Sequence, residues 1–195
     1  CDLPSEPLWL EQVHGTRVAT PEDAESAPAD ALVTDRAGLV CAVLTADCLP
    51  VVLAAADGSE VGVAHAGWRG LAAGILEATV ARFAAPPEAL AAWLGPAISQ
   101  PAFEVGDEVR QAFVGPDPGA DRCFAANARG RWQADLYGLA RRRLTRLGVV
   151  KVRGGGRCTF AEPEVFYSYR RDGPCGRMAT FVYRADPAQE LEITP

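Results

Sequence analysis

Short runs of apolar and β-branched residues recur along the first half of the chain. Most of these runs are apolar throughout and end at glycine, proline or aspartate, which is typical of strands that are covered on both faces and bounded by turns. The strands predicted in this way span residues 8–13, 31–34, 39–45, 51–55, 61–64 and 91–94.

Apolar positions spaced three or four residues apart predict three helices, at residues 71–83, 105–113 and 136–147. Residues 165–169 and 179–183 are predicted to form two more strands, ahead of a polar tail from Ala185. The last helix carries an arginine cluster, which is most simply a solvated face. The cluster consists of Arg141, Arg142, Arg143 and Arg146.

The chain contains no internal repeat, no low-complexity linker and no shift in composition. Its 195 residues suffice to bury one sizeable core. The order of the elements therefore predicts a single mixed α/β domain over residues 1–195, with a large and partly antiparallel sheet.

The net charge of the chain argues against two classes of binding partner. Lys and Arg total 19 and Asp and Glu total 25, which gives a formal net charge of −6. Nucleic acids and anionic membranes are bound through basic surfaces, so neither partner is expected. The longest apolar run, residues 39–56, contains Asp47 and Pro50 and is shorter than the ~20 apolar residues that a membrane-spanning helix needs.

The cysteines argue against a disulfide framework, because no two of them form a CxxC pair. This usage favours a reducing, cytoplasmic location. The six cysteines are Cys1, Cys41, Cys48, Cys123, Cys158 and Cys175.

Both histidines of the chain lie where a predicted strand runs into a glycine turn. His14 directly precedes a glycine, His65 lies two residues before one, and Cys48 follows the end of another apolar run. Three strand ends can thus bring these side chains to one point. Two imidazoles and a thiolate are a competent ligand set for zinc, and three protein ligands leave a fourth position open, as in catalytic zinc sites.

Spacing alone leaves other interpretations open. The three residues are 34 and 17 positions apart and match no zinc-finger pattern. Structural histidines and an ordinary core cysteine would give the same pattern. Cys48 could also be a thiolate nucleophile with His14 or His65 as its base. Asp47 either orients a metal ligand, caps the loop or faces solvent.

Arginines beside glycines form a candidate anion site. Guanidinium groups on tight loops suit bidentate binding of phosphate or carboxylate. Arg69 is preferred because it lies four residues after His65, at a predicted helix N-terminus. Arg170 and Arg177 are further candidates, whereas Arg171 is interpreted as forming a surface ion pair with the aspartate that follows it.

Several motifs follow one another in a specific order: Gln12-Val13-His14-Gly15, Asp30-Ala31-Leu32-Val33-Thr34, Thr45-Ala46-Asp47-Cys48-Leu49-Pro50 and His65-Ala66-Gly67-Trp68-Arg69-Gly70. In this order they resemble the YfiH/YlmD family, once called multicopper polyphenol oxidases or laccase-domain proteins. Later segments, among them Leu94-Gly95-Pro96-Ala97-Ile98 and residues 166–173, extend the resemblance over nearly the whole chain.

The resemblance implies an α+β fold, namely a single-domain four-layer α/β/β/α sandwich that is distantly similar to cysteine-hydrolase-like folds. It places the zinc ligands of the family on His14, Cys48 and His65. It also implies a purine nucleoside phosphorylase that acts on adenosine, inosine and methylthioadenosine with phosphate and has adenosine deaminase activity. Cys48, Arg69 and Arg170 are then the expected catalytic residues. Family members usually carry a further N-terminal segment, which the resemblance implies is missing here.

Other functions stay open beside this one. Copper-dependent phenol oxidation needs many more histidines than the two present, so copper is a weaker candidate than zinc. Hydrolysis of a mis-incorporated amino acid in a peptidoglycan precursor is an alternative, because some family members are connected with such editing. A zinc-stabilised binding module would unfold on chelation, whereas a protein with an open catalytic site would stay folded.

Overall fold

Six strands form a mixed sheet in the order β1-β2-β5-β4-β6-β10 in the computed structural model, which describes residues 3–185. The inner strands are antiparallel to their neighbours, and β1 and β10 join the two edges in parallel. Cys1 and the tail after Ala185 lie outside the described residues. The strands are β1 (Val18–Ala19), β2 (Ala31–Thr34), β4 (Leu49–Ala55), β5 (Val61–Ala66), β6 (Leu90–Leu94) and β10 (Lys151–Gly154).

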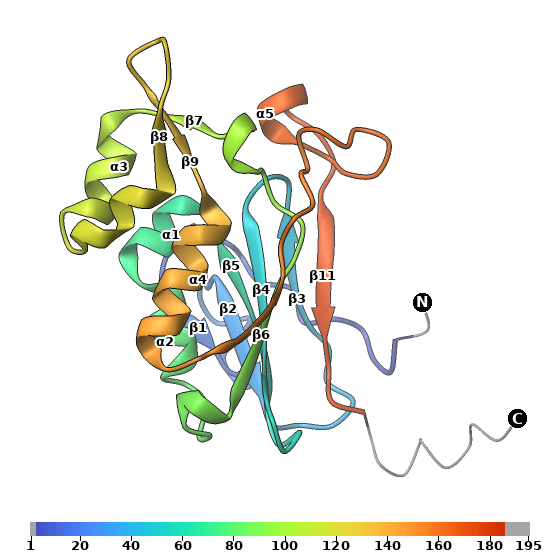
Figure 1. Cartoon of the computed structure of the whole chain (residues 1–195). Coiled ribbons are helices and arrows are strands. Elements are labelled where there is room, and N and C mark those ends of the chain that lie inside the picture. Colours follow the sequence, from blue (N-terminus) through green and yellow to red (C-terminus); the bar gives the residue numbers. More distant parts are fainter. Residues whose placement is uncertain (1–2, 186–195) are drawn as a thin grey trace, which may run out of the picture.

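Helices cover one face of this sheet (Figure 1). They are α1 (Trp68–Ala73), α2 (Ile75–Val80) and α4 (Leu136–Leu147), and the main apolar core lies between them and the sheet. At one end of the domain, α3 (Asp107–Val114) packs against a small sheet of β7 (Glu104–Val105), β9 (Trp132–Ala134) and β8 (Phe124–Ala126). Short helices η1 (Pro87–Ala89), η2 (Gln100–Ala102), η3 (Pro118–Cys123) and α5 (Tyr169–Asp172) lie in the connections.

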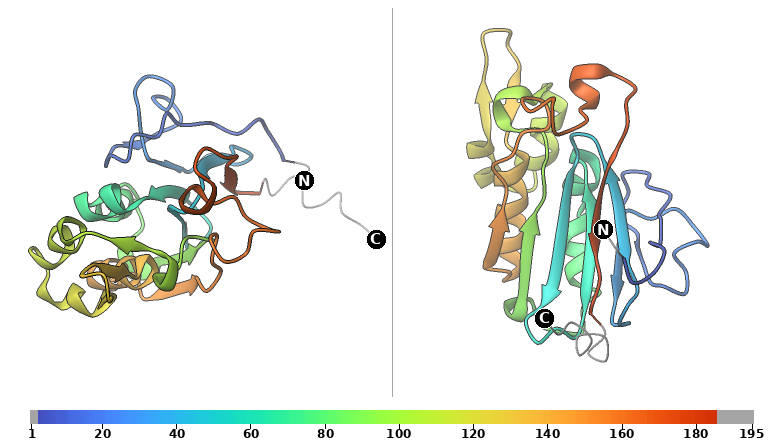
Figure 2. Two further views of the ribbon diagram at one scale, coloured as in Figure 1. Left: turned by 90° about the horizontal axis from the view of Figure 1, so that it is seen from above. Right: turned by 90° about the vertical axis from the view of Figure 1, so that its right-hand side faces the viewer.

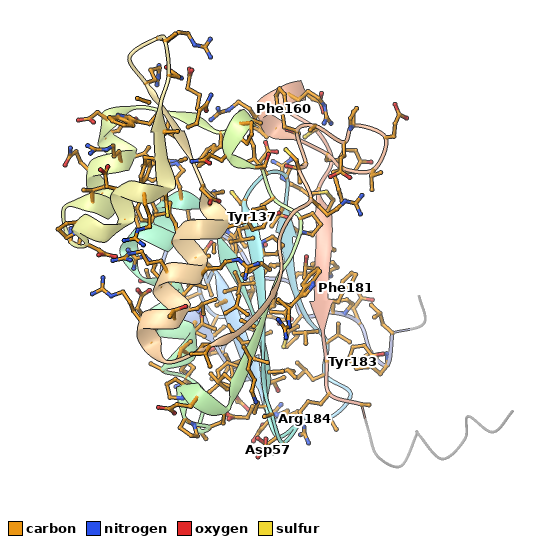
Figure 3. The ribbon with its side chains drawn as sticks, in the orientation of Figure 1. Asp57, Tyr137, Phe160, Phe181, Tyr183 and Arg184 are labelled. Carbon is orange, nitrogen blue, oxygen red and sulfur yellow. The ribbon has the colours of Figure 1, made fainter. Side chains whose placement is uncertain are left out.

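A two-stranded antiparallel sheet covers the opposite face of the large sheet. It consists of β3 (Cys41–Thr45) and β11 (Met178–Val182), which contact β5 and are seen in front of it in Figure 2, right. Phe181 and Tyr183 lie on the outer side of this layer (Figure 3). Residues 3–185 thus form one of the two helical layers and both sheet layers of the expected α/β/β/α sandwich, and the single-domain α+β fold is confirmed.

The predicted strand at residues 8–13 is wrong. Only Leu8 forms a bridge, with Cys41 of β3. Further along, the side chain of Gln12 replaces the backbone of a partner strand, because its amide donates to the Leu44 carbonyl at 2.9 Å and accepts from the Leu44 N–H at 2.7 Å. The segment therefore follows β3 without forming a ladder.

The predicted helix at residues 71–83 is two helices, and the predicted strand at 165–169 is absent. Gly74 has a φ of 106°, which ends α1 and begins α2. Such a conformation is readily adopted only by glycine. In the second case the Ser168 hydroxyl accepts from the Arg171 N–H and caps α5, so the chain turns where a strand was expected.

The arginines of α4 are not a solvated face, because all four have partners. Arg142 and Arg146 pair with Asp117, and Arg143 pairs with Glu77. Arg141 donates to two carbonyls of β10. The cluster therefore fixes α4 to its neighbours. None of the helices within residues 3–185 is long and apolar enough to cross a membrane.

Candidate metal centre and anion pocket

His65 is fixed by a buried acid. It lies near the end of β5 and is only 3% exposed. Its Nδ1 is 2.8 Å from Oδ1 of Asp30, a fully buried residue that directly precedes β2. A carboxylate on Nδ1 selects the tautomer that leaves Nε2 free to bind a ligand.

The same carboxylate builds the turn that carries His14. Asp30 accepts the backbone N–H groups of Val13, His14 and Gly15, at 3.2, 2.9 and 2.7 Å. His14 has a φ of 61°, in the left-handed region that side chains other than glycine rarely adopt. The three hydrogen bonds offset the cost of this conformation. One acid therefore orients both histidines.

Cys48 completes the cluster from the loop between β3 and β4. Its Sγ lies 3.8 Å from Nε2 of His14. The ligand atoms of His14, Cys48 and His65 all lie within 4.8 Å of one another. The three residues that the sequence selected are thus brought together and form a candidate metal-binding group.

Because Gly67 has no side chain, there is room beside it for His14 and Cys48. A Cβ atom at this position would lie 2.8 Å from Cδ2 of His14 and 2.9 Å from Sγ of Cys48. Both distances are shorter than ordinary van der Waals contacts, so any side chain here would displace a candidate ligand.

The cluster favours a thiolate beside an imidazolium. Burial opposes ionisation of Cys48, but hydrogen bonds and charge from His14 and His65 outweigh it and lower the pKa of the thiol to about 7. Burial likewise opposes protonation of His65, but Asp30 and Cys48 raise its pKa to about 9. The thiolate is the form in which cysteine binds a metal, and His65 becomes a ligand once a metal displaces its Nε2 proton.

A pocket of about 600 Å³ opens over the cluster. Arg69, Arg170 and Arg177 all line it, so the three predicted anion ligands reach the same cavity as the candidate metal group. Aromatic and aliphatic side chains supply the rest of its wall, including Leu10, Leu44, Trp68, Ile98, Phe103 and Tyr169.

No guanidinium group of these three arginines forms an ion pair with a carboxylate in the part of the chain that the structure describes. The guanidinium of Arg69 lies 4.4 Å above the Trp68 ring. That of Arg170 donates to the Glu104 carbonyl at 2.9 Å, and that of Arg177 donates to backbone carbonyls. The pocket is therefore cationic and suits an anionic ligand.

Arg171 differs from its neighbours. It forms the expected ion pair with Asp172, at 2.7 Å. It also donates to the carbonyls of Thr159, Phe160 and Phe166, so its role is structural.

The donor set fits zinc better than the copper sites of oxidases. Two imidazole nitrogens and one thiolate are ordinary zinc ligands and leave a coordination position free for water or substrate. Trinuclear copper centres require many more histidines than the two in this chain.

Sequence reasoning gave no role to Asp30 or Gly67. Asp30 stands at the start of a strand motif, but its partners are 15 to 35 residues away in the chain. An acid directly before an apolar strand is a signal for such a role, because a carboxylate that becomes buried there needs donors.

The chain is similar to known proteins over nearly its whole length. The family model described as multi-copper polyphenol oxidoreductase laccase matches residues 1–185. Purine nucleoside phosphorylase YfiH of Escherichia coli is 54% identical over 184 residues, which cover 93% of this chain and 75% of that protein. Purine nucleoside phosphorylase of Xylella fastidiosa (strain Temecula1) is 53% identical over 190 residues, with 93% and 73% covered.

A solved structure shares the fold. A Neisseria meningitidis protein matches with a TM-score of 0.90 and 47% identity, covering 92% of this chain and 75% of that one. With a family model matched over nearly its whole length and relatives above 50% identity, the chain belongs to the multi-copper polyphenol oxidoreductase laccase family.

Proposed function

We propose that the protein is a zinc-dependent purine nucleoside phosphorylase that acts on adenosine, inosine and methylthioadenosine. The observation that carries this proposal is the single pocket that contains both the His14, Cys48 and His65 group and three arginines without acidic partners. Relatives named purine nucleoside phosphorylase at 54% and 53% identity support the same reaction.

The reaction assigns a task to each part of the pocket. Phosphorolysis breaks the bond between C1′ of the sugar and N9 of the purine, while a phosphate oxygen bonds to C1′. Arg69 and Arg170 hold the phosphate through charge-assisted hydrogen bonds, and Arg177 adds positive charge beside them. The apolar wall at Ile98 and Phe103 takes the purine, whose flat faces suit aromatic and aliphatic neighbours.

His14, Cys48 and His65 would hold the zinc ion, oriented by Asp30. When bound, zinc supplies a Lewis acid at this end of the pocket. The same site supports the second part of the proposal, adenosine deaminase activity, which replaces the amino group at C6 of the purine by an oxygen from water. Phenol oxidation is disfavoured, since the donor set lacks the histidines of multicopper centres.

The five cysteines within residues 3–185 are all free, which supports a reducing compartment such as the cytoplasm.

The experiment is chromatography of adenosine incubated with zinc-loaded protein, with and without phosphate. Adenine that forms only with phosphate supports phosphorolysis, and inosine that forms without phosphate supports deamination. Cys48→Ala should abolish both products and lose the metal, because it removes one of three ligands. Cys158→Ala is the matched control, since Cys158 is similarly exposed but lies outside the pocket lining. Full activity of metal-free Cys48→Ala would overturn the proposal.

A second substrate distinguishes the hydrolytic alternative. The Asp30–His65–Cys48 arrangement also resembles that of enzymes with a cysteine nucleophile, a histidine base and an orienting acid. A peptidoglycan precursor that carries L-Ser in place of L-Ala should be left intact by the protein. Its cleavage, together with no product from adenosine, would favour the editing function instead.

A further inference from the structure

The carboxylate of Asp47 joins two parts of the pocket wall that are far apart in the sequence. Its Oδ1 accepts a hydrogen bond from the Thr159 hydroxyl at 2.6 Å, and its Oδ2 accepts one from the Arg170 N–H at 2.7 Å. Asp47 is 9% exposed and Thr159 is fully buried. We propose that Asp47 is a positioning residue that holds the arginine-bearing segment over the candidate metal centre.

The segment that Asp47 binds, residues 159–172, is held together by hydrogen bonds from Arg171. The guanidinium of Arg171 donates to the carbonyls of Thr159, Phe160 and Phe166. Residues 159–172 therefore form one unit, and Asp47 binds it near both ends. Because the two hydrogen bonds of Asp47 reach residues that are eleven positions apart, they restrict both the rotation of the unit and its distance from the Cys48 loop.

Asp47 also belongs to the loop that carries Cys48, one of the candidate metal ligands. Asp47 directly precedes Cys48 and has a φ of 89°, so the backbone turns sharply between β3 and the ligand. The Asp47 carbonyl also accepts the Ile98 N–H at 3.0 Å, which fixes the loop to the pocket wall. Loss of the hydrogen bonds of Asp47 therefore leaves Arg170 free to move relative to Cys48.

A direct role at the metal does not fit these contacts. Both carboxylate oxygens of Asp47 are engaged by Thr159 and Arg170. The orienting carboxylate of His65 belongs to Asp30 instead. Of the roles considered for Asp47, the structure favours loop fixation, with consequences for the anion rather than for the metal.

The test uses two variants that break the same connection from opposite sides. Asp47→Asn tolerates the positive φ but turns one acceptor into a donor. Thr159→Val removes the hydroxyl at nearly constant volume, from a residue outside the pocket lining. Thr79→Val is the matched control, because Thr79 is equally buried and its hydroxyl donates to the Ile75 carbonyl within α2.

The kinetic part of this proposal rests on the proposed function, so a second measurement that does not depend on catalysis is made as well. In phosphorolysis, Asp47→Asn and Thr159→Val should raise the KM for phosphate about tenfold, as expected when the displaced Arg170 loses one charge-assisted hydrogen bond to the phosphate. The KM for the nucleoside and the bound zinc should stay within about twofold of the values for the unmodified protein. Thr79→Val should leave all three unchanged.

Hydrogen exchange followed by mass spectrometry tests positioning without catalysis. Backbone amides of residues 159–172 should exchange faster in both variants than in the unmodified protein and in Thr79→Val. If adenosine is not cleaved but this exchange rises, positioning holds and the proposed function fails. Unchanged exchange in both variants, or a loss of zinc that accompanies the rise in KM, would overturn the role assigned to Asp47.

Discussion

Gly67 is the residue at which a single added carbon would most directly disturb the candidate metal group. Its missing Cβ leaves room for the His14 ring and the Cys48 sulfur, which would otherwise lie 2.8 and 2.9 Å away. We expect Gly67→Ala to lower zinc affinity about 10-fold to 100-fold, the range found when groups supporting metal ligands are changed. Competition with a chromophoric chelator measures this affinity.

Gly15→Ala is the matched control for this change. A Cβ there would meet Asp30 at 3.5 Å, which is an ordinary contact, so its zinc affinity should match that of the unmodified protein. Equal affinity in Gly67→Ala and Gly15→Ala would show that the cluster can move to accept the extra carbon.

The ligand types could be predicted at this scale, but their supporting residues could not. His14, Cys48 and His65 carry a chemical signal of their own, since imidazole and thiolate are ordinary zinc ligands. Asp30 and Gly67 act through what lies next to them in space. Asp30 supports a turn 15 residues earlier and a histidine 35 residues later, which no local pattern encodes.

At the scale of elements, Gly74 separates α1 from α2. Its φ of 106° is unfavourable for any residue with a Cβ. We expect Gly74→Ala to lower the free energy of unfolding by about 1–2 kcal/mol without loss of zinc, because the strain is local to the backbone. Denaturant titration measures the change.

Gly74→Asn provides the comparison, because asparagine tolerates left-handed conformations better than alanine does. It should lose less stability than Gly74→Ala. An alanine variant as stable as the unmodified protein would indicate that α1 and α2 can merge into one continuous helix.

Elements with an unbroken apolar run or a clear helical period could be predicted, and the shortest, irregular ones could not. The predicted ranges 31–34 and 136–147 match β2 and α4 residue for residue, since burial on a sheet or on one helix face leaves a clear apolar pattern. The strands β7, β8 and β9 have two or three residues each, too few for a period to show. Residues 8–13 have the apolar pattern of a strand, but the side chain of Gln12, rather than its backbone, forms the hydrogen bonds to Leu44 of β3.

At the scale of the molecule, the candidate metal group lies at one end of the β4–β5 pair, where it lines the pocket, whereas the main core between helices and sheet is built from apolar side chains alone. We therefore expect chelation to leave the domain folded and only to remove the stabilisation by bound metal. At 100 times Kd this stabilisation is about 2.7 kcal/mol. For a chain of this size it corresponds to roughly 5–10 °C in Tm.

Thermal melts with and without chelator, followed by circular dichroism, measure this shift. The chelated protein should keep a cooperative transition and its secondary structure at 25 °C. A flat melt after chelation would identify the metal as a structural clamp and the protein as a zinc-stabilised binding module.

The pocket itself is a property of the whole molecule. Its lining runs from Leu10 to Arg177 and includes turns and loops from both ends of the chain. Sequence motifs could indicate which residues are chemically suited to the site. Their meeting point depends on the stacking of the two sheets, which requires the complete fold.

The two hydrogen bonds between the Gln12 amide and Leu44 also satisfy part of a sheet edge. β3 has β11 along one side, and its other side is an edge where another chain could add as a strand. Such edges are where folded proteins begin to aggregate. By occupying the backbone groups of Leu44, the Gln12 side chain removes one pairing point from this edge, so one residue both lines the pocket and closes part of the sheet edge beside it.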